Sequence, residues 1–253
     1  MILFRKLMRI AVAQISAKDG NIIENLEEHY RLIEIAADNG VQLIAFPEMS
    51  ITGYQREFAE KLSFTEYDSR LDKLRTLAVD KNIIIIAGAP IKIGLGLFIG
   101  SFVIFPDGSI SIYTKQFLHS GEDAFFTSSF DYNPIINLEN DRISLAICAD
   151  INNPLHIRNA SKLNSTIYIS SIFFTPKGIL EAYDLLSDYA KSYSMNVLVS
   201  NFSGVSWGLD AGGKSGLWSE KGDLIAGLDN CSTGLVIGQK DKDTWTSIVI
   251  KDR

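Results

Sequence analysis

The fold of this chain is decided by the stretch ISLAICAD, residues 143–150, in which a strand-like segment ends at a cysteine. Ile143–Ile147 is largely apolar, and the polar residues that follow it end the pattern, which is typical of a buried strand. Arg9–Ile15 and Val41–Phe46 have the same character, and Pro154–Leu163 has the spacing of a helix. The alternation of such strands with helices predicts an α/β fold.

The rest of the chain continues this alternation. We expect further helices at Asn21–Asn39, Leu71–Val79 and Ile179–Tyr193. We expect further strands at Asn82–Ala87, Ile91–Ile93, Leu97–Phe105, Ser109–Tyr113, Thr166–Ile172, Val197–Ser200 and several short segments between 215 and 250. Pro90 is expected to separate two of these strands, and Pro106-Asp107-Gly108 predicts a hairpin turn. Hairpins beside hydrophobic strands predict mixed sheets that are covered on both faces. No repeat or low-complexity linker divides the sequence, so we expect residues 1–253 to form a single domain.

Composition excludes several classes of protein. The 253 residues include 24 Lys and Arg against 30 Asp and Glu, a net charge of −6, and 46% are hydrophobic. These values exclude a disordered or collagen-like chain, and the acidic balance argues against nucleic acid or an anionic membrane as a partner. The only two cysteines, Cys148 and Cys231, lie far apart and give no disulfide framework. No segment is typical of a membrane span or a signal peptide, so we expect a cytoplasmic setting.

Three predicted strands are followed by residues of catalytic type. Glu48 follows the strand at 41–46, Lys115 and then Glu122 follow the strand at 109–113, and Cys148 follows the strand at 143–147. Catalytic groups in α/β folds gather at strand ends, where loops vary over a rigid scaffold. Taken singly, each residue has an ordinary interpretation: a solvated loop carboxylate, a surface lysine or a small buried hydrophobic residue.

Taken together, these segments resemble the nitrilase, or carbon–nitrogen hydrolase, superfamily. The matching motifs are Phe46-Pro47-Glu48 with Thr52-Gly53-Tyr54, Lys115 with Glu122, Cys148-Ala149-Asp150, and the opening strand Met8–Gln14. Their order and rough separation agree with the family over nearly the whole chain. The resemblance implies an α-β-β-α sandwich of two mixed sheets, which often pairs into homodimers. It also suggests that Met8 is the natural start and that residues 1–7 are an upstream extension.

The resemblance implies that Glu48, Lys115 and Cys148 are catalytic and that the chain hydrolyses a small linear amide or an N-carbamoyl compound. Cys148 would form a thioester and release ammonia or an amine, and Glu48 would be its base, because burial raises the proton affinity of a carboxylate. Lys115 and the backbone N–H of Ala149 would stabilise the oxyanion. Glu122 would orient Lys115 or Glu48, or polarise the substrate.

The sequence departs from the family pattern after the cysteine. Ala149 replaces an aromatic residue, and residues 151–155 lack the arginine and glutamate that many relatives have. In some relatives that arginine region contacts a substrate carboxylate, so we expect a neutral pocket that is roomier near Cys148. Phe173 and Phe174 follow a predicted strand where relatives line the acyl pocket, but core packing explains such residues equally well. The glycine-rich loop at 201–208 is expected to close near the site.

Other functions share these residues. Nitrile hydrolysis and acyl transfer to an amine would use the same Glu48, Lys115 and Cys148, and a noncatalytic binding protein could retain the fold. No His pair or Asp cluster has the spacing of metal ligands, so we expect no metal and no cofactor. The expected partner is a small amide substrate.

Overall fold

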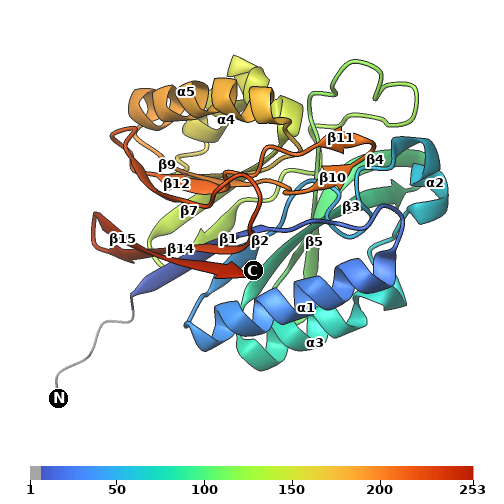
Figure 1. Cartoon of the computed structure of the whole chain (residues 1–253), viewed down its shortest axis with the longest axis horizontal. Helices are drawn as coiled ribbons and strands as arrows, with labels where there is room; N and C mark the ends of the chain where they lie inside the picture. Colours follow the sequence, from blue (N-terminus) through green and yellow to red (C-terminus); the bar gives the residue numbers. More distant parts are fainter. Residues whose placement is uncertain (1–6, 253) are drawn as a thin grey trace.

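The computed structural model describes residues 7–252 and contains two large mixed β-sheets stacked face to face (Figure 1). The seven-stranded sheet has the order β15-β14-β1-β2-β3-β4-β5. Its strands are β1 Met8–Gln14, β2 Leu43–Ala45, β3 Ile84–Ile93, β4 Gly96–Ile104, β5 Ile110–Thr114, β14 Thr233–Asp241 and β15 Thr244–Asp252. β1, β2 and β3 pair in parallel, whereas the remaining pairs are antiparallel.

The six-stranded sheet has the order β13-β12-β9-β8-β7-β6. Its strands are β6 Ile136–Leu138, β7 Asp141–Ile147, β8 Ile167–Ser171, β9 Asn196–Ser200, β12 Gly216–Trp218 and β13 Leu224–Gly227. β7, β8 and β9 pair in parallel, and the other pairs are antiparallel. A short hairpin of β10 Val205–Ser206 and β11 Leu209–Asp210 stands apart from both sheets.

Helices cover the outer face of each sheet. The longer helices are α1 Ile22–Asp38 and α3 Asp72–Lys81 on the seven-stranded sheet and α4 Pro154–Lys162 and α5 Pro176–Tyr193 on the six-stranded sheet (Figure 1). Short helical turns occur at α2 Ala59–Leu62, η1 Arg56–Phe58, η2 Ser69–Leu71 and η3 Cys148–Asn152. The four layers confirm the predicted α-β-β-α sandwich. No helix within residues 7–252 is long and apolar enough to span a bilayer.

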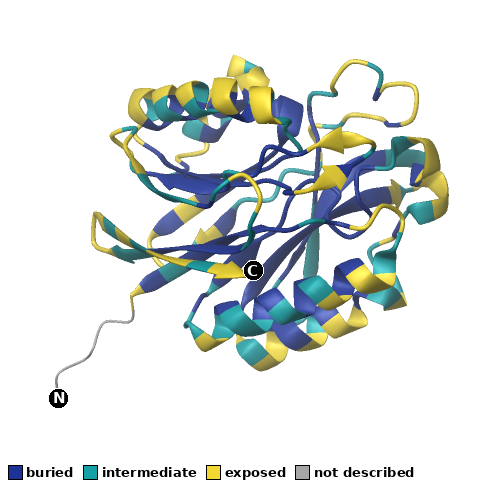
Figure 2. Cartoon of the chain, in the orientation of Figure 1, coloured by how far each residue is buried: buried dark blue, intermediate teal, exposed yellow. Residues whose placement is uncertain are grey.

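Side-chain alternation along the strands builds a separate core on each face of a sheet. In β1, Ile10 and Val12 pack into the cluster between the two sheets, whereas Ala11 and Ala13 pack into the cluster beneath the helices. This period of two follows from strand geometry, in which successive side chains point to opposite faces. Figure 2 shows the result, with buried central strands between helices that are exposed on their outer sides, while edge strands such as β15 are partly exposed.

The predicted break at Pro90 was wrong, because β3 runs without interruption from Ile84 to Ile93. The Pro90 carbonyl accepts a hydrogen bond from the Phe64 N–H at 2.9 Å, on the side of β3 away from β4. The nitrogen of a strand residue faces the same side as its carbonyl, so the missing N–H of proline removes no bond between β3 and β4. The predicted extension at residues 1–7 lies, except for Leu7, outside the described residues.

Candidate active site

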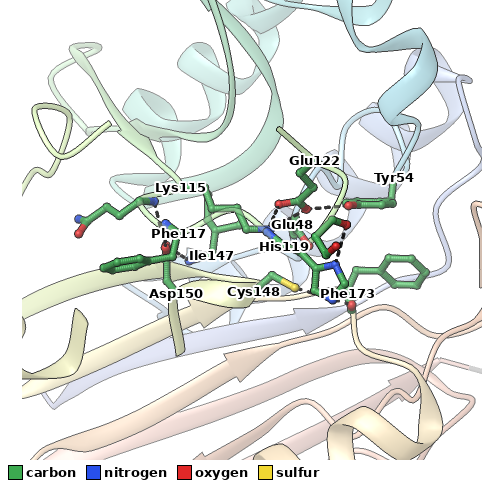
Figure 3. A network of polar contacts seen from close by, with 12 residues as sticks. Glu48, Tyr54, Lys115, Phe117, His119, Glu122, Ile147, Cys148, Asp150 and Phe173 are labelled. Atoms are coloured by element: carbon green, nitrogen blue, oxygen red, sulfur yellow. Dashed lines mark hydrogen bonds and ion pairs between the residues drawn. The ribbon is translucent and has the colours of Figure 1, made fainter. Parts of the chain in front are cut away.

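The three residues predicted to be catalytic lie together although they are far apart in the sequence. Glu48 follows β2, Lys115 directly follows β5, and Cys148 directly follows β7 (Figure 3). Lys115 Nζ donates hydrogen bonds to Glu48 Oε1 at 2.8 Å and to Glu122 Oε1 at 2.7 Å. All four side chains are buried, and Glu48, Glu122 and Cys148 line one cavity of about 470 Å³.

Cys148 occupies a sharp bend between β7 and the η3 turn. Its φ of +46° lies in the left-handed region, which non-glycine residues seldom adopt. Strain of this kind persists only where the surroundings hold it, and it gathers at functional sites. The Cys148 thiol donates to the Phe173 carbonyl at 3.9 Å, so its position is tied to the segment that follows β8.

The Glu48 loop is seated against the neighbouring strand through a glycine. A Cβ at Gly88 of β3 would lie 2.5 Å from the Met49 nitrogen and 3.2 Å from the Glu48 carbonyl carbon. Only glycine permits this approach. The Gly88 N–H also donates to Ser50 Oγ at 3.2 Å, and buried His29 holds that hydroxyl through Nε2 at 2.9 Å. His29 therefore helps to hold the Glu48 loop in place through Ser50.

Burial and neighbouring charges set the protonation of the site. Burial raises the pKa of Glu48 to about 7, because the opposing effect of the Lys115 charge is only partial. Burial and the adjacent Glu48 charge raise the pKa of the Cys148 thiol well above its usual range. Burial alone would lower the pKa of Lys115, but the charges of Glu48, Cys148 and Glu122 raise it. Above pH 7 the resting site therefore holds a thiol, a carboxylate and an ammonium.

Two atoms at the centre keep unused hydrogen-bonding capacity. Among the described residues, Glu48 Oε2 is buried and has no hydrogen-bond partner. Lys115 has three N–H donors, of which Glu48 and Glu122 occupy two. A buried carboxylate oxygen without a hydrogen-bond partner lowers the stability of the fold. Such atoms are found at sites where a substrate or a transferred proton supplies the missing hydrogen bond. The site thus offers a proton acceptor and a cationic donor beside a thiol.

Glu122 is held too firmly to move freely. Its Oε1 also accepts a hydrogen bond from the Tyr54 hydroxyl at 2.6 Å, and its Oε2 accepts from the His119 backbone N–H at 2.6 Å. Both oxygens are thus engaged, which supports the expected role of orienting Lys115. Tyr54 was not predicted as a site residue, although the quoted Thr52-Gly53-Tyr54 motif contains it.

The predicted pocket residues differ in their placement. Phe173 and Phe174 both line the cavity that contains Cys148, together with Asn152. Ala149 does not belong to this lining but borders a neighbouring hollow, which it shares with Asn152 and residues of the 116–120 loop. Its position outside the lining of the Cys148 cavity gives no support to the expectation that a small residue at 149 widens that pocket.

Asp150, the last residue of the cysteine motif, joins the loops that carry Lys115 and Cys148. Its Oδ1 accepts hydrogen bonds from the backbone N–H groups of Gln116 and Phe117 at 2.9 and 2.8 Å. Its Oδ2 accepts from the Ile147 N–H at 2.9 Å and from the Tyr113 hydroxyl at 2.6 Å. The aspartate thus fixes the start of both loops (Figure 3).

Comparisons with known proteins agree with this architecture. A nitrilase from Pyrococcus abyssi is 27% identical over 150 residues, which cover 57% of this chain and 56% of that protein. A glutamine-dependent NAD(+) synthetase from Thermotoga maritima is 22% identical over 239 residues, which cover 87% of this chain and 40% of the synthetase. The chain thus spans about half or less of the length of these curated relatives.

Solved structures show the same fold over almost the whole chain. An amidase from Nesterenkonia sp. superposes with a TM-score of 0.85 at 22% identity, covering 96% of this chain and 94% of that chain. A variant of the Nesterenkonia sp. AN1 amidase, with the acetamide moiety of fluoroacetamide added covalently at its active-site cysteine, gives a TM-score of 0.84 at 22% identity and covers 92% and 90%. The family model described as carbon–nitrogen hydrolase matches residues 9–249, and this chain belongs to that family.

Proposed function

We propose that this chain hydrolyses a small linear amide or an N-carbamoyl compound through a thioester on Cys148. The observation that carries the proposal is that Glu48 and Cys148 line one cavity while buried Lys115 donates a hydrogen bond to Glu48. Among the described residues, Glu48 Oε2 has no hydrogen-bond partner. The covalent acetamide adduct in the Nesterenkonia sp. AN1 amidase supports the same chemistry at a cysteine.

In the proposed first half-reaction, Glu48 takes the thiol proton as Sγ of Cys148 attacks the amide carbon. The carbonyl oxygen becomes an oxyanion, which the third N–H of Lys115 and the backbone N–H of Ala149 stabilise; one such donor contributes roughly 3–4 kcal/mol. Glu48 returns the proton to the leaving nitrogen as the C–N bond breaks. Ammonia or an amine departs, and the acyl group remains on sulfur.

In the second half-reaction, water attacks the thioester carbon. Glu48 accepts a proton from this water and returns it to the departing thiolate, so that the acid leaves and the thiol is restored. The pKa of about 7 at Glu48 suits this role, since a base near ambient pH both accepts and returns a proton readily. Glu122 acts by holding Lys115 in place.

The test is intact-protein mass spectrometry with parallel ammonia release on amides, N-carbamoyl compounds, nitriles and glutamine. We expect a covalent adduct and ammonia with the wild type and neither with Cys148→Ala. Turnover of nitriles alone would favour nitrile hydrolysis, and adducts discharged only by added amines would favour acyl transfer. A wild type without any adduct or ammonia across the panel would contradict catalysis and favour a binding protein. EDTA should leave turnover unchanged, and loss on chelation would contradict the absence of a metal.

The charge of the cavity narrows the proposed substrates. Its charged lining residues are Glu48, Glu122 and Glu181, and no lysine or arginine of the described residues belongs to the lining. A substrate carboxylate would find no counter-ion there, so we expect butyramide to be hydrolysed at least about tenfold more efficiently than succinamate. Equal kcat/KM values for the two amides would contradict this expectation.

The same proposal includes a single domain over residues 1–253, a homodimer and a cytoplasmic setting. The net charge of −6 supports the exclusion of nucleic acid as a partner. Size-exclusion chromatography with light scattering tests the dimer, and a monomeric mass at micromolar concentration would contradict it.

A further inference from the structure

The β10–β11 hairpin brings a tryptophan to the candidate active site. Trp207 lies at the turn between the two strands and lines the cavity with Tyr54 and Phe173. The glycine-rich loop was expected to close near the site, and the structure agrees. Because this hairpin belongs to neither large sheet, its position must be fixed by other contacts.

Three aromatic rings form one wall of the cavity. The ring centroids of Tyr54 and Phe173 are 5.3 Å apart, and those of Tyr54 and Trp207 are 5.5 Å apart at an interplanar angle of 72°. Such spacings are typical of favourable aromatic pairs. The backbone of Phe173 also contacts the thiol, since its carbonyl accepts from Cys148. Trp207 is connected to Phe173 through the Tyr54 ring.

Trp207 is held from three directions. Its backbone N–H donates to Asp19 Oδ2 at 2.8 Å, and its indole Nε1–H donates to Glu57 Oε2 at 3.0 Å. The guanidinium of Arg56 lies 4.0 Å from the indole centroid, within the range of a cation–π contact. An indole with its polar atom bonded and its face covered is preorganised.

Asp19 fixes Tyr54 through the same contacts. Its Oδ1 accepts from Ser206 Oγ at 2.6 Å, and that hydroxyl accepts from the Tyr54 N–H at 3.0 Å. A Cβ at Gly53 would lie 2.5 Å from Asp19 Oδ1, so the chain before Tyr54 presses directly on this carboxylate. One aspartate therefore helps to position both Tyr54 and Trp207.

We propose that Trp207, held by Asp19, Glu57 and Arg56, limits the length of the acyl group, so that the preferred substrates are amides with short apolar acyl chains. This inference rests on the proposed function and names the substrate class of the same site. Such a wall excludes chains that reach it, because turning the indole aside would break its hydrogen bond to Glu57 and its contact with Arg56. Trp207 is a specificity residue and takes no part in proton transfer.

The first experiment compares kcat and KM for acetamide, propionamide, butyramide and hexanamide in wild type, Trp207→Ala and Trp207→Phe. We expect Trp207→Ala to raise the ratio of kcat/KM for hexanamide over propionamide at least about tenfold, chiefly through KM, with a smaller rise in Trp207→Phe. Tyr67→Ala, which removes an aromatic residue that is 80% exposed and outside the cavity, should keep the wild-type ratio. An unchanged ratio with all rates lowered equally would show a merely structural role and overturn the inference.

A second experiment separates this inference from the proposed hydrolysis. Alkylation of Cys148 by 2-bromopropanamide, 2-bromobutanamide and 2-bromohexanamide reports pocket length without turnover, because all three are secondary bromides. Intact mass measures it in a Cys231→Ser background, which removes the second, exposed thiol. We expect wild type to react progressively more slowly along the series and Trp207→Ala to lose this decline. Asp19→Ala should lose part of this decline, because the Trp207 backbone then loses one of the contacts that hold it. If amides are not hydrolysed but the alkylation rate still falls with chain length in wild type and not in Trp207→Ala, the proposed hydrolysis is contradicted and the inference about Trp207 stands. If the alkylation rate falls equally in wild type and Trp207→Ala, the inference is overturned.

Discussion

Two buried polar networks flank the end of β5, and they differ in whether all of their polar atoms have hydrogen-bond partners. The first, Glu48, Lys115 and Glu122, borders the cavity and leaves Glu48 Oε2 without a partner among the described residues. The second surrounds Asp150, whose two oxygens accept four hydrogen bonds and whose neighbours are themselves paired.

The second network continues away from the cavity through paired groups. Tyr113 Oη lies 2.8 Å from His156 Nε2, and His156 Nδ1 lies 2.7 Å from the Tyr168 hydroxyl. None of these three residues lines the cavity. Fully paired buried groups hold a structure in place, whereas an unpaired buried oxygen is free to exchange a proton. The comparison therefore supports the proposal that the first network takes part in catalysis and that the second positions the loops.

The largest effect on activity is expected when Glu48 can no longer accept a proton. Glu48→Gln keeps the side-chain shape but cannot accept a proton, so we expect kcat/KM to fall about 10³-fold or more with the thermal midpoint nearly unchanged. Steady-state kinetics and thermal denaturation measure the two quantities. Glu220→Gln, a change at an exposed glutamate, should leave both as in the wild type. A Glu48→Gln enzyme within tenfold of wild type would contradict the role of base.

A large loss of stability is expected from removing the shared cation. Lys115→Met leaves Glu48 and Glu122 buried without a counter-ion, which should lower the free energy of unfolding by about 3–5 kcal/mol at neutral pH. Urea denaturation measures this loss. The exposed pair of Lys92 and Glu60 provides the control, because Lys92→Met should cost about 1 kcal/mol or less. Similar losses in the two variants would show that the buried ion pairs contribute no more to the free energy of unfolding than the exposed pair does.

A pH dependence follows from the raised pKa of Glu48. Below its pKa of about 7 the carboxyl is protonated and cannot accept the thiol proton, so kcat/KM should fall about tenfold per pH unit below 7. Because this pKa lies above that of an unfolded glutamate, the folded state binds more protons between about pH 4.5 and 7, and stability should fall as pH rises through that window. A kcat/KM profile that is flat from pH 5 to 8 would contradict this assignment.

The smallest effect is expected in the second network. Tyr113→Phe removes one hydrogen bond to Asp150 and one to His156, which should destabilise the fold by about 1–3 kcal/mol. Asp150 keeps its backbone donors, so we expect kcat/KM to fall less than about tenfold and the pH midpoint to stay near that of the wild type. A shifted midpoint in Tyr113→Phe would show that the two networks titrate together and would remove the distinction between them.

The four layers were predicted from the family resemblance, whereas local periodicity predicted the strands and helices that form them. Alternating strands and helices, and the turn at Pro106-Asp107-Gly108, lie where the local chemistry indicates. The strand break predicted at Pro90 was wrong because the backbone of Pro90 faces Phe64, a residue distant in sequence, and not β4. Local spacing contains no information about such a contact.

At the site, motif order identified Glu48, Lys115, Glu122 and Cys148 as neighbours. Tyr113, His156 and Tyr168 were missed as a network, because single polar residues within apolar strands and helices look like ordinary core positions. The position of Ala149 outside the cavity lining was missed for a different reason. Which hollow a residue borders after a sharp bend depends on backbone angles that the motif does not contain.

The left-handed backbone at Cys148 affects the choice of an inactive variant for trapping substrates. The φ of +46° costs an alanine or a serine about as much as it costs the cysteine, so both should preserve the bend. Glycine adopts this region without strain, so Cys148→Gly would allow the loop after β7 to change conformation. A thiol-free protein used as a faithful mimic of the substrate-bound enzyme should therefore retain a Cβ at this residue.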